Sequence, residues 1–274
     1  NATDCGGAIY IIADDSSKVS QITNSIFENN KALNGGAIYL HSDKATIEGS
    51  TFLANSADND GAAVYVAGDY CNLANSTFTD NIAVGNVSTH DKQIVNYTTS
   101  GGNGGAIIWT GSVGIVDNCT FERNNASCLG GALYLQRNEN VTFKDSSFTS
   151  NNAGQNGGAI MFNEGAENGV LTNLIFTNNT AERNGGAIFW NGYNGTIKNS
   201  KFNNNRATGT KCEHDMDLNM GTSIEVLSGG NLRLGNIVVL QTNTLPDNPD
   251  TYKDNLVVLN STEGNIAHFE SWVR

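Results

Sequence analysis

The sequence predicts an all-β protein, a single-stranded parallel β-helix, on the basis of two alternating motifs and an unusual composition. The first motif, Gly-Gly-Ala-Ile-Tyr or a close variant, begins at Gly6, Gly35, Gly61, Gly104, Gly130, Gly157 and Gly185. The second motif, Phe-x-x-Asn-x-Ala, begins at Phe27, Phe52, Phe78, Phe121, Phe148, Phe176 and Phe202. The 41 Asn and 31 Gly residues disfavour long helices, while 38 % hydrophobic residues are enough to fill a core.

The spacing of the second motif defines the repeat. Successive Phe residues lie 25, 26, 43, 27, 28 and 26 residues apart, so the unit is about 26 residues long with one enlarged member. A unit of this size cannot bury its own apolar face. The units must therefore stack, with each strand pairing in parallel with its counterpart in the next coil. The Gly pairs supply the corners with positive φ that such a coil needs.

Short strands are expected on both sides of the tight corners within each unit. An apolar residue stands five positions before each Phe, at Ile22, Ile47, Leu73, Val116, Phe143, Leu171 and Ile197. Turn residues such as Asn24 and Gly49 separate this position from the Phe. Alternation with a period of two indicates strands rather than helices. Stacking then makes the Phe column an internal aromatic stack and the Asn column an internal ladder of hydrogen-bonded amides.

We expect one domain of about nine or ten coils. Residues 1–222 hold the repeats, with inserted loops at 84–103 and 208–220 that leave the same corner of the coil, and residues 223–274 form divergent coils and a C-terminal cap. Solenoids need covered ends, yet the chain opens directly on a Gly-Gly corner. It is therefore expected to be a monomeric fragment of a longer protein.

Charge and composition exclude several classes of function. The formal net charge is −12 and no basic stripe is present, which argues against nucleic acid as a partner. No apolar stretch reaches 18 residues, so no membrane span is predicted in this fragment. Sequons for N-glycosylation favour an exported glycoprotein, although a chain this rich in Asn, Ser and Thr also produces sequons by chance. Besides Asn1, the candidates are Asn75, Asn86, Asn96, Asn118, Asn125, Asn140, Asn178, Asn194 and Asn260.

The alternation of Gly-Gly-Ala-Ile with Phe-x-x-Asn resembles the repeats of two surface families, the adhesin-like proteins of methanogenic archaea and the polymorphic outer membrane proteins of chlamydiae. The resemblance extends from Cys5 to about Ala207. Segments rich in Asn and Thr, such as residues 179–188 and 194–202, look closer to the archaeal group. The resemblance implies a right-handed β-helix on the cell surface that takes part in attachment. It implies no catalytic residues and no cofactor.

The main alternative is an enzyme, because parallel β-helices also carry polysaccharide lyases and hydrolases. Hydrolysis needs two or three carboxylates on one face of neighbouring coils, and a lyase needs a calcium-binding carboxylate cluster with a basic residue. Carboxylates do not recur in register here, and the acidic pair Asp14-Asp15 falls in a turn. A non-enzymatic adhesin is therefore expected. A structural stalk that binds nothing is a further alternative.

One segment, Lys211 to Asp217, is denser in chemical groups. Its Glu213, His214, Asp215 and Asp217 could hold a cation. The spacing of a calcium-binding loop is absent, so a solvated loop is the competing interpretation.

A column of aromatic residues is the main candidate for ligand binding. Tyr39, Tyr65 and Tyr134 follow the aliphatic position of the first motif, so they should face outward and could stack on a sugar or contact a protein. Alternatively, these tyrosines brace one another. The enlarged repeat adds His90, Asp91, Lys92 and Tyr97, and the strands after nearby corners add Trp109 and Trp190. The expected partner is a glycan or protein of another cell, met outside the cell.

Overall fold

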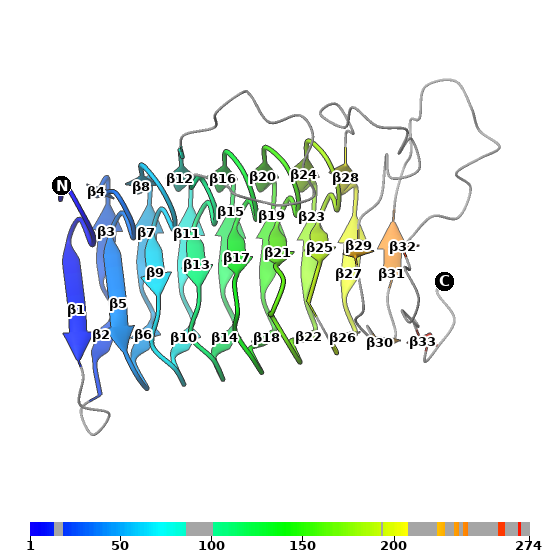
Figure 1. Ribbon diagram of the computed structural model, residues 1–274, viewed down its shortest axis with the longest axis horizontal. Coiled ribbons are helices and arrows are strands. Elements are labelled where there is room, and N and C mark those ends of the chain that lie inside the picture. The colour runs from blue at the N-terminus through cyan, green and yellow to red at the C-terminus, as the bar shows by residue number, and fades with distance from the viewer. Residues whose placement is uncertain are drawn as a thin grey trace.

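The computed structural model describes residues 1–13, 19–85, 101–192 and 194–207, together with the backbone of five strands between residues 224 and 269. The described chain is all-β and forms a right-handed parallel β-solenoid, which confirms the predicted fold class. Figure 1 shows the coils stacked along the long axis of the molecule, with the N-terminus at one end.

Each complete coil contributes one strand to each of four parallel sheets, and β1 to β28 make seven such coils. The first sheet follows the Gly-Gly corner. Its strands are β1 (Ile9–Ala13), β5 (Ile38–Ser42), β9 (Val64–Val66), β13 (Ile107–Trp109), β17 (Leu133–Leu135), β21 (Ile160–Phe162), β25 (Ile188–Trp190), β29 (Ile224–Leu227) and β32 (Val257–Asn260).

The second sheet contains the apolar position that lies five residues before each Phe. Its strands are β2 (Gln21–Thr23), β6 (Thr46–Glu48), β10 (Asn72–Ala74), β14 (Ile115–Asp117), β18 (Thr142–Lys144), β22 (Val170–Thr172), β26 (Thr196–Lys198), β30 (Arg233–Gly235) and β33 (His268–Phe269).

The third sheet contains the Phe column. Its strands are β3 (Ile26–Glu28), β7 (Thr51–Leu53), β11 (Thr77–Thr79), β15 (Thr120–Glu122), β19 (Ser147–Thr149), β23 (Ile175–Thr177), β27 (Lys201–Asn203) and β31 (Val238–Leu240).

The fourth sheet is made of two-residue strands that end on the Ala of the second motif. These are β4 (Lys31–Ala32), β8 (Ser56–Ala57), β12 (Ile82–Ala83), β16 (Asn125–Ala126), β20 (Asn152–Ala153), β24 (Thr180–Ala181) and β28 (Arg206–Ala207).

Seven complete coils are fewer than the nine or ten expected. The difference arises after Ala207, where β29 to β33 extend the first three sheets but none of the described strands extends the fourth. The expected division at residue 222 stays a prediction.

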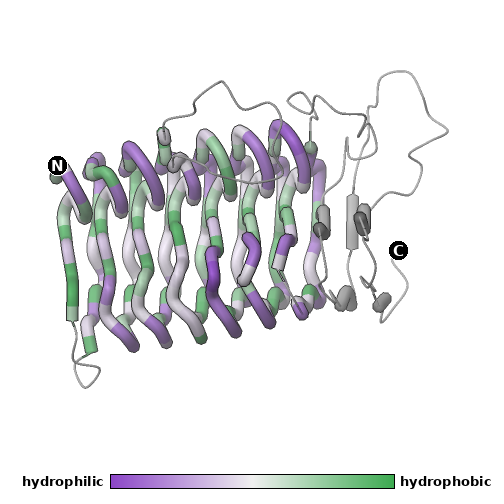
Figure 2. The backbone as a smooth tube through the Cα atoms, viewed as in Figure 1, coloured by the Kyte–Doolittle hydropathy of each residue, from purple (hydrophilic) through white to green (hydrophobic). Residues whose placement is uncertain are grey.

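Like residues face like residues in the stack, as the repeat predicts. Phe52 pairs in register with Phe27 on one side and with Phe78 on the other. Neighbouring Phe rings along the whole column are parallel, with centroids 4.6 to 4.9 Å apart. Figure 2 shows hydrophobic and hydrophilic residues alternating over short stretches of each coil, the pattern of strands with one buried face.

The Gly-Gly corner needs both of its glycines, for different reasons. Gly35 has φ 58°, in the left-handed region that other residues adopt at a cost. A Cβ on Gly36 would lie 2.1 Å from the carbonyl oxygen of Ala62 in the next coil. The first glycine therefore makes the turn, and the second allows the coils to approach.

Trp109 and Trp190 are core residues, which corrects their expected place in a ligand-binding surface. Both are 0 % exposed. Each stands two positions after an inward-facing residue of the same strand, Ile107 or Ile188, so it shares the inward direction.

The inward tryptophans fit because small residues lie opposite them. A Cβ on Gly114 would lie 2.3 Å from Cζ2 of Trp109, and a Cβ on Gly195 would lie 2.0 Å from Cζ2 of Trp190. In the coil next to that of Trp109, the smaller Leu135 of the tryptophan column allows a buried Val141 in the glycine column. The two columns therefore compensate each other in size.

Candidate functional site

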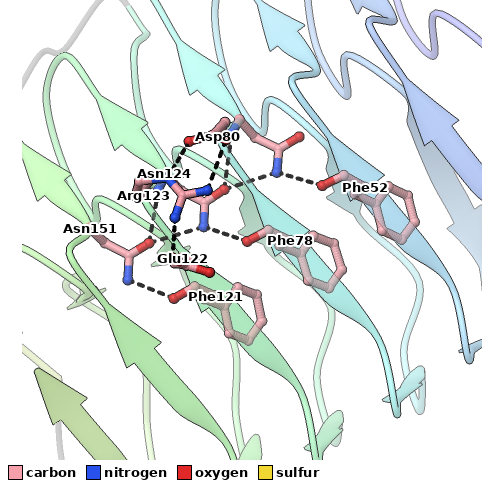
Figure 3. Close-up of polar contacts among 9 residues, drawn as sticks. Phe52, Phe78, Asp80, Phe121, Glu122, Arg123, Asn124 and Asn151 are labelled. Atoms are coloured by element: carbon pink, nitrogen blue, oxygen red, sulfur yellow. Dashed lines mark hydrogen bonds and ion pairs between the residues drawn. The ribbon is translucent and has the colours of Figure 1, made fainter.

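The most regular polar feature of the molecule is a buried amide ladder, which Figure 3 shows around Asn124. The Nδ2 group of each ladder Asn donates to Oδ1 of the next Asn at 2.8 to 3.0 Å. From Asn55 onward it also donates to the carbonyl oxygen of a Phe in the preceding coil at 2.9 to 3.1 Å. Both Nδ2 hydrogens are thus used inside the protein. The ladder is structural, as predicted, and offers nothing to a ligand.

The outward column of the first sheet is the candidate functional site. It runs through Tyr10, Tyr39, Tyr65, Ile108, Tyr134, Met161 and Phe189. The preceding aliphatic column packs in the main core, so the tyrosines face away from it, as predicted. Exposure falls along the column, because Tyr10 is 55 % exposed, Tyr39 and Tyr65 are half-buried, and Tyr134 is 4 % exposed. Among the seven complete coils, the accessible part of the column therefore lies in the first three.

Tyr134 is buried in a separate apolar cluster on the outer side of the first sheet. The cluster also contains Ile108, Leu129, Met161 and Phe189. This placement corrects the expectation that Tyr134 is available to a ligand. The alternation of the strand gives the direction of its side chain, but it does not give the exposure.

Tyr10, Tyr39 and Tyr65 form a stack that we call the tyrosine row. The ring centroids of Tyr10 and Tyr39 lie 5.2 Å apart and those of Tyr39 and Tyr65 lie 4.8 Å apart, with interplanar angles of 27° in both pairs. Each ring therefore covers a face of its neighbour. The row presents ring edges and hydroxyl groups, instead of the flat faces that the sequence suggested for stacking on a sugar.

The three hydroxyl groups of the tyrosine row differ in their hydrogen-bond partners. The buried Tyr134, which lies outside the row, serves for comparison, because its hydroxyl accepts a hydrogen bond from Nδ2 of Asn163 in the next coil at 2.7 Å. Tyr65 has the hydroxyl of Thr110 at the equivalent position. The equivalent residue for Tyr39 is Ala67, which has no side-chain hydrogen-bonding group. Within the described chain, the hydroxyls of Tyr10 and Tyr39 make no hydrogen bond.

The surroundings of the row are acidic. Burial raises the pKa of Tyr39 and of Tyr65, and the negative charge of Asp60 adds to the rise at Tyr65, while that of Asp4 adds to it at Tyr39. The hydroxyls therefore stay protonated at neutral pH and can donate hydrogen bonds. Among the described residues, no cationic side chain contributes to either shift.

Asp60 belongs to a second polar ladder that the sequence analysis missed. It lies in the corner directly before Gly61, where its Oδ1 accepts from both the backbone N and Nδ2 of Asn103 at 3.0 Å. In the preceding coil, Oδ1 of Asn34 accepts from Nδ2 of Asn59 at 2.9 Å. Burial raises the pKa of Asp60, and the hydrogen bonds from Asn103 oppose this rise. The sequence does contain a pattern that predicts this second ladder, because Asn or Asp directly precedes the Gly-Gly pair in most repeats.

Several predicted site residues lie outside the described residues. These are His90, Asp91, Lys92 and Tyr97, the cation candidates Glu213, His214, Asp215 and Asp217, and the sequon residues Asn86 and Asn96, with the side chain of Asn260. Within the described ranges, no group of three or more His, Cys, Asp or Glu side chains could hold a metal ion. At the end of the first insertion, the backbone N of Gly102 donates to the carbonyl oxygen of Asn59 at 2.8 Å. The chain thus re-enters at the corner before the first sheet.

Most described sequons lie at exposed corners. Asn75, Asn118, Asn140, Asn178 and Asn194 are exposed and have positive φ. Asn75 and Asn118 are neighbours in one ladder, with Nδ2 of Asn118 donating to Oδ1 of Asn75 at 2.8 Å. Asn125 differs, because it is a half-buried residue of β16 that accepts a hydrogen bond from Asn152.

Comparison with known families agrees with this geometry. The described residues contain no helix that is long and apolar enough to cross a membrane. Residues 173–189 match the Chlamydia polymorphic membrane protein repeat, which supports the chlamydial half of the resemblance. Comparison with curated proteins and with solved structures gives no match. Residues 7–175 match the right handed beta helix region, over more than half of the 274 residues, and the chain belongs to this family.

Proposed function

We propose that this chain is a cell-surface adhesin domain that attaches to other cells or host surfaces by binding a glycan or protein partner. The observation that carries the proposal is the tyrosine row. In three neighbouring coils the outward column stays accessible, and two of its hydroxyl groups have no partner in the described protein. The same column is buried in the next four coils, at Ile108, Tyr134, Met161 and Phe189. Accessible, unsatisfied polar groups on a rigid scaffold suit recognition of a partner.

The location and origin that we propose follow from the repeat. The match to the chlamydial repeat and the exposed sequons support an extracellular, surface-attached protein. The resemblance of the Asn- and Thr-rich segments to adhesin-like proteins of methanogenic archaea supports an archaeal source. The chain would then be one monomeric fragment of a longer surface protein, without a cofactor.

We propose no catalytic role for the described residues. Glycoside hydrolysis needs a pair of carboxyl groups about 5 to 10 Å apart on one face. The expectation that carboxylates do not recur in register is wrong at the corner between the first and second sheets, where Asp43 lies beside Asp69 and Glu139 bridges to Glu167 in the next coil. The carboxylates of Asp43 and Asp69 accept hydrogen bonds from backbone N atoms of the next coil, at 2.9 and 2.7 Å. Others are paired with cations, Asp80 with Arg123 and Asp117 with Lys144. A carbohydrate-active enzyme of the lyase or hydrolase type remains the alternative, and release of reducing ends from polysaccharides would identify it.

Adhesion measured with a matched pair of variants tests the proposal. Beads coated with the purified domain should attach to target cells, and the double variant Tyr10→Ser/Tyr39→Ser should attach less. Tyr70→Ser is the control, because Tyr70 is 57 % exposed at a corner away from the row. Unchanged melting would show that the variants fold. Absence of attachment by the wild-type domain would favour a structural stalk, and full attachment by the double variant would place binding elsewhere.

A further inference from the structure

We propose that the ligand of the tyrosine row is an uncharged polysaccharide chain that lies extended along the axis of the rod. This inference rests on the proposed function and specifies the ligand class for the same site. It identifies the partner as a glycan, with a protein partner as the competing outcome.

The first argument is the match between two repeating structures. Each of the first three coils contributes one tyrosine to the row, and the ring centroids of neighbouring tyrosines lie 5.2 and 4.8 Å apart. This separation is comparable to the length of one sugar unit in an extended chain. A polysaccharide running along the row would thus meet one hydroxyl per sugar unit.

The second argument is the kind of group that the row offers. Protein partners bind most strongly through aromatic or Arg side chains that fill desolvated pockets. The ring faces of Tyr39 are instead covered by Tyr10 on one side and Tyr65 on the other. What remains is a line of hydroxyl groups, and those of Tyr10 and Tyr39 have no hydrogen-bond partner in the described chain. Sugar hydroxyls can both donate to and accept from such groups.

The third argument is charge. Asp60 acts electrostatically on Tyr65 and Asp4 on Tyr39, and no cation in the described part of the chain opposes them. The chain as a whole carries a formal charge of −12. A polysaccharide of uronic acids or sulfated sugars would be repelled, so the row selects against polyanions.

Binding of defined oligosaccharides tests the inference. Neutral β-linked glucose and N-acetylglucosamine oligomers of one to six units would be titrated into the domain, next to uronic acid oligomers of equal length. We expect affinity to increase with each added unit up to about three, one for each tyrosine of the row, and uronic acid oligomers to bind more weakly. Binding that is independent of length, or tighter for the uronic acids, would overturn the inference.

Variants that remove single oxygen atoms locate the contact. Tyr10→Phe and Tyr39→Phe keep the stacked rings and remove the hydroxyls, and each should weaken binding of the neutral trimer roughly three- to tenfold. Tyr70→Phe, outside the row, should leave the affinity unchanged. Equal affinity of all three variants would overturn the inference. If the domain attaches to cells but binds neither the neutral nor the uronic acid oligomers, and protease treatment of the cells abolishes attachment, the partner is a protein. The ligand class is then wrong while the proposed adhesin function stands.

Discussion

At the scale of single residues, the fold depends on Asn side chains that are fully engaged. Asn151 is 1 % exposed, and its Nδ2 donates both to Oδ1 of Asn179 at 2.9 Å and to the carbonyl oxygen of Phe121 at 3.0 Å. Its Oδ1 accepts from Asn124 of the preceding coil. One side chain thus joins neighbouring coils and satisfies backbone groups at a corner that would otherwise be buried without partners.

Replacing a member of either internal column should therefore be costly. Phe148→Ala is expected to lower the free energy of unfolding by about 3 to 5 kcal/mol, because it leaves a cavity between two stacked rings. Asn151→Ala is expected to cost about 1 to 3 kcal/mol through unsatisfied polar groups. Thr149→Ala, on the outward face of the same strand, is the control. Denaturant unfolding measures all three, and equal midpoints for the control and either core variant would contradict the role of the ladders.

The ionised carboxylate of Asp60 lowers the stability of the folded protein, because it is buried. Burial raises its pKa in the folded state above that of the unfolded chain, which is about 4. The folded protein therefore binds the proton more tightly. The stability gained from protonation is fully present below about pH 4 and is lost as the pH rises through the raised folded-state pKa.

Asp60→Asn should relieve this cost, because Asn occupies the equivalent corner position at Asn34 and Asn103. The variant should melt at a higher temperature than the wild type at pH 7, and the difference should shrink towards pH 4. Melting curves at the two pH values measure both quantities. A wild type that is at least as stable as the variant at pH 7 would show that the carboxylate is needed in its ionised form.

At the scale of elements, large inward side chains of the first sheet pack against small residues that lie directly before the strands of the second sheet. Trp190 in β25 and Gly195 before β26 are one such pair, and Trp109 with Gly114 is another. The sequence shows both residue types, but it does not show that they touch, because they belong to different columns of the coil. The expected place of the tryptophans in a ligand-binding surface is wrong for a simpler reason, because strand alternation gives Trp109 and Trp190 the inward direction of Ile107 and Ile188.

The pairing predicts a rescue. Gly195→Ala should destabilise the protein by about 1 to 3 kcal/mol, since its Cβ would overlap the Trp190 ring. Trp190→Leu should leave a cavity and also destabilise. The double variant should be more stable than the sum of the two effects predicts, because Leu135 with Val141 already forms this arrangement in another coil. Additive losses in a double-mutant cycle would refute direct packing.

At the scale of the whole molecule, the repeat predicts most of the fold. Parallel stacking, the Phe column and the amide ladder follow from motifs that recur in every unit, because identical residues must meet in a stack of coils. The number of coils was overestimated, since apolar segments after Ala207 read as strands but the described ones do not complete a four-stranded coil. The candidate site was predicted in part. The direction of the tyrosines follows from strand alternation, whereas their exposure depends on what packs outside the sheet, as the buried Tyr134 shows.

The corners before the first sheet also affect the rate at which their Asn side chains deamidate. Asn34-Gly35, Asn103-Gly104 and Asn156-Gly157 are the dipeptides in which Asn most readily loses ammonia, as the glycine nitrogen attacks the side-chain carbonyl carbon. In the solenoid, the nitrogens of Gly35, Gly104 and Gly157 donate to carbonyl oxygens of the next coil at 2.9 to 3.0 Å. The attacking nitrogen of the deamidation reaction is thus held in a hydrogen bond at these three corners. Stacking of the coils should therefore slow deamidation of Asn34, Asn103 and Asn156, and unfolding should accelerate it.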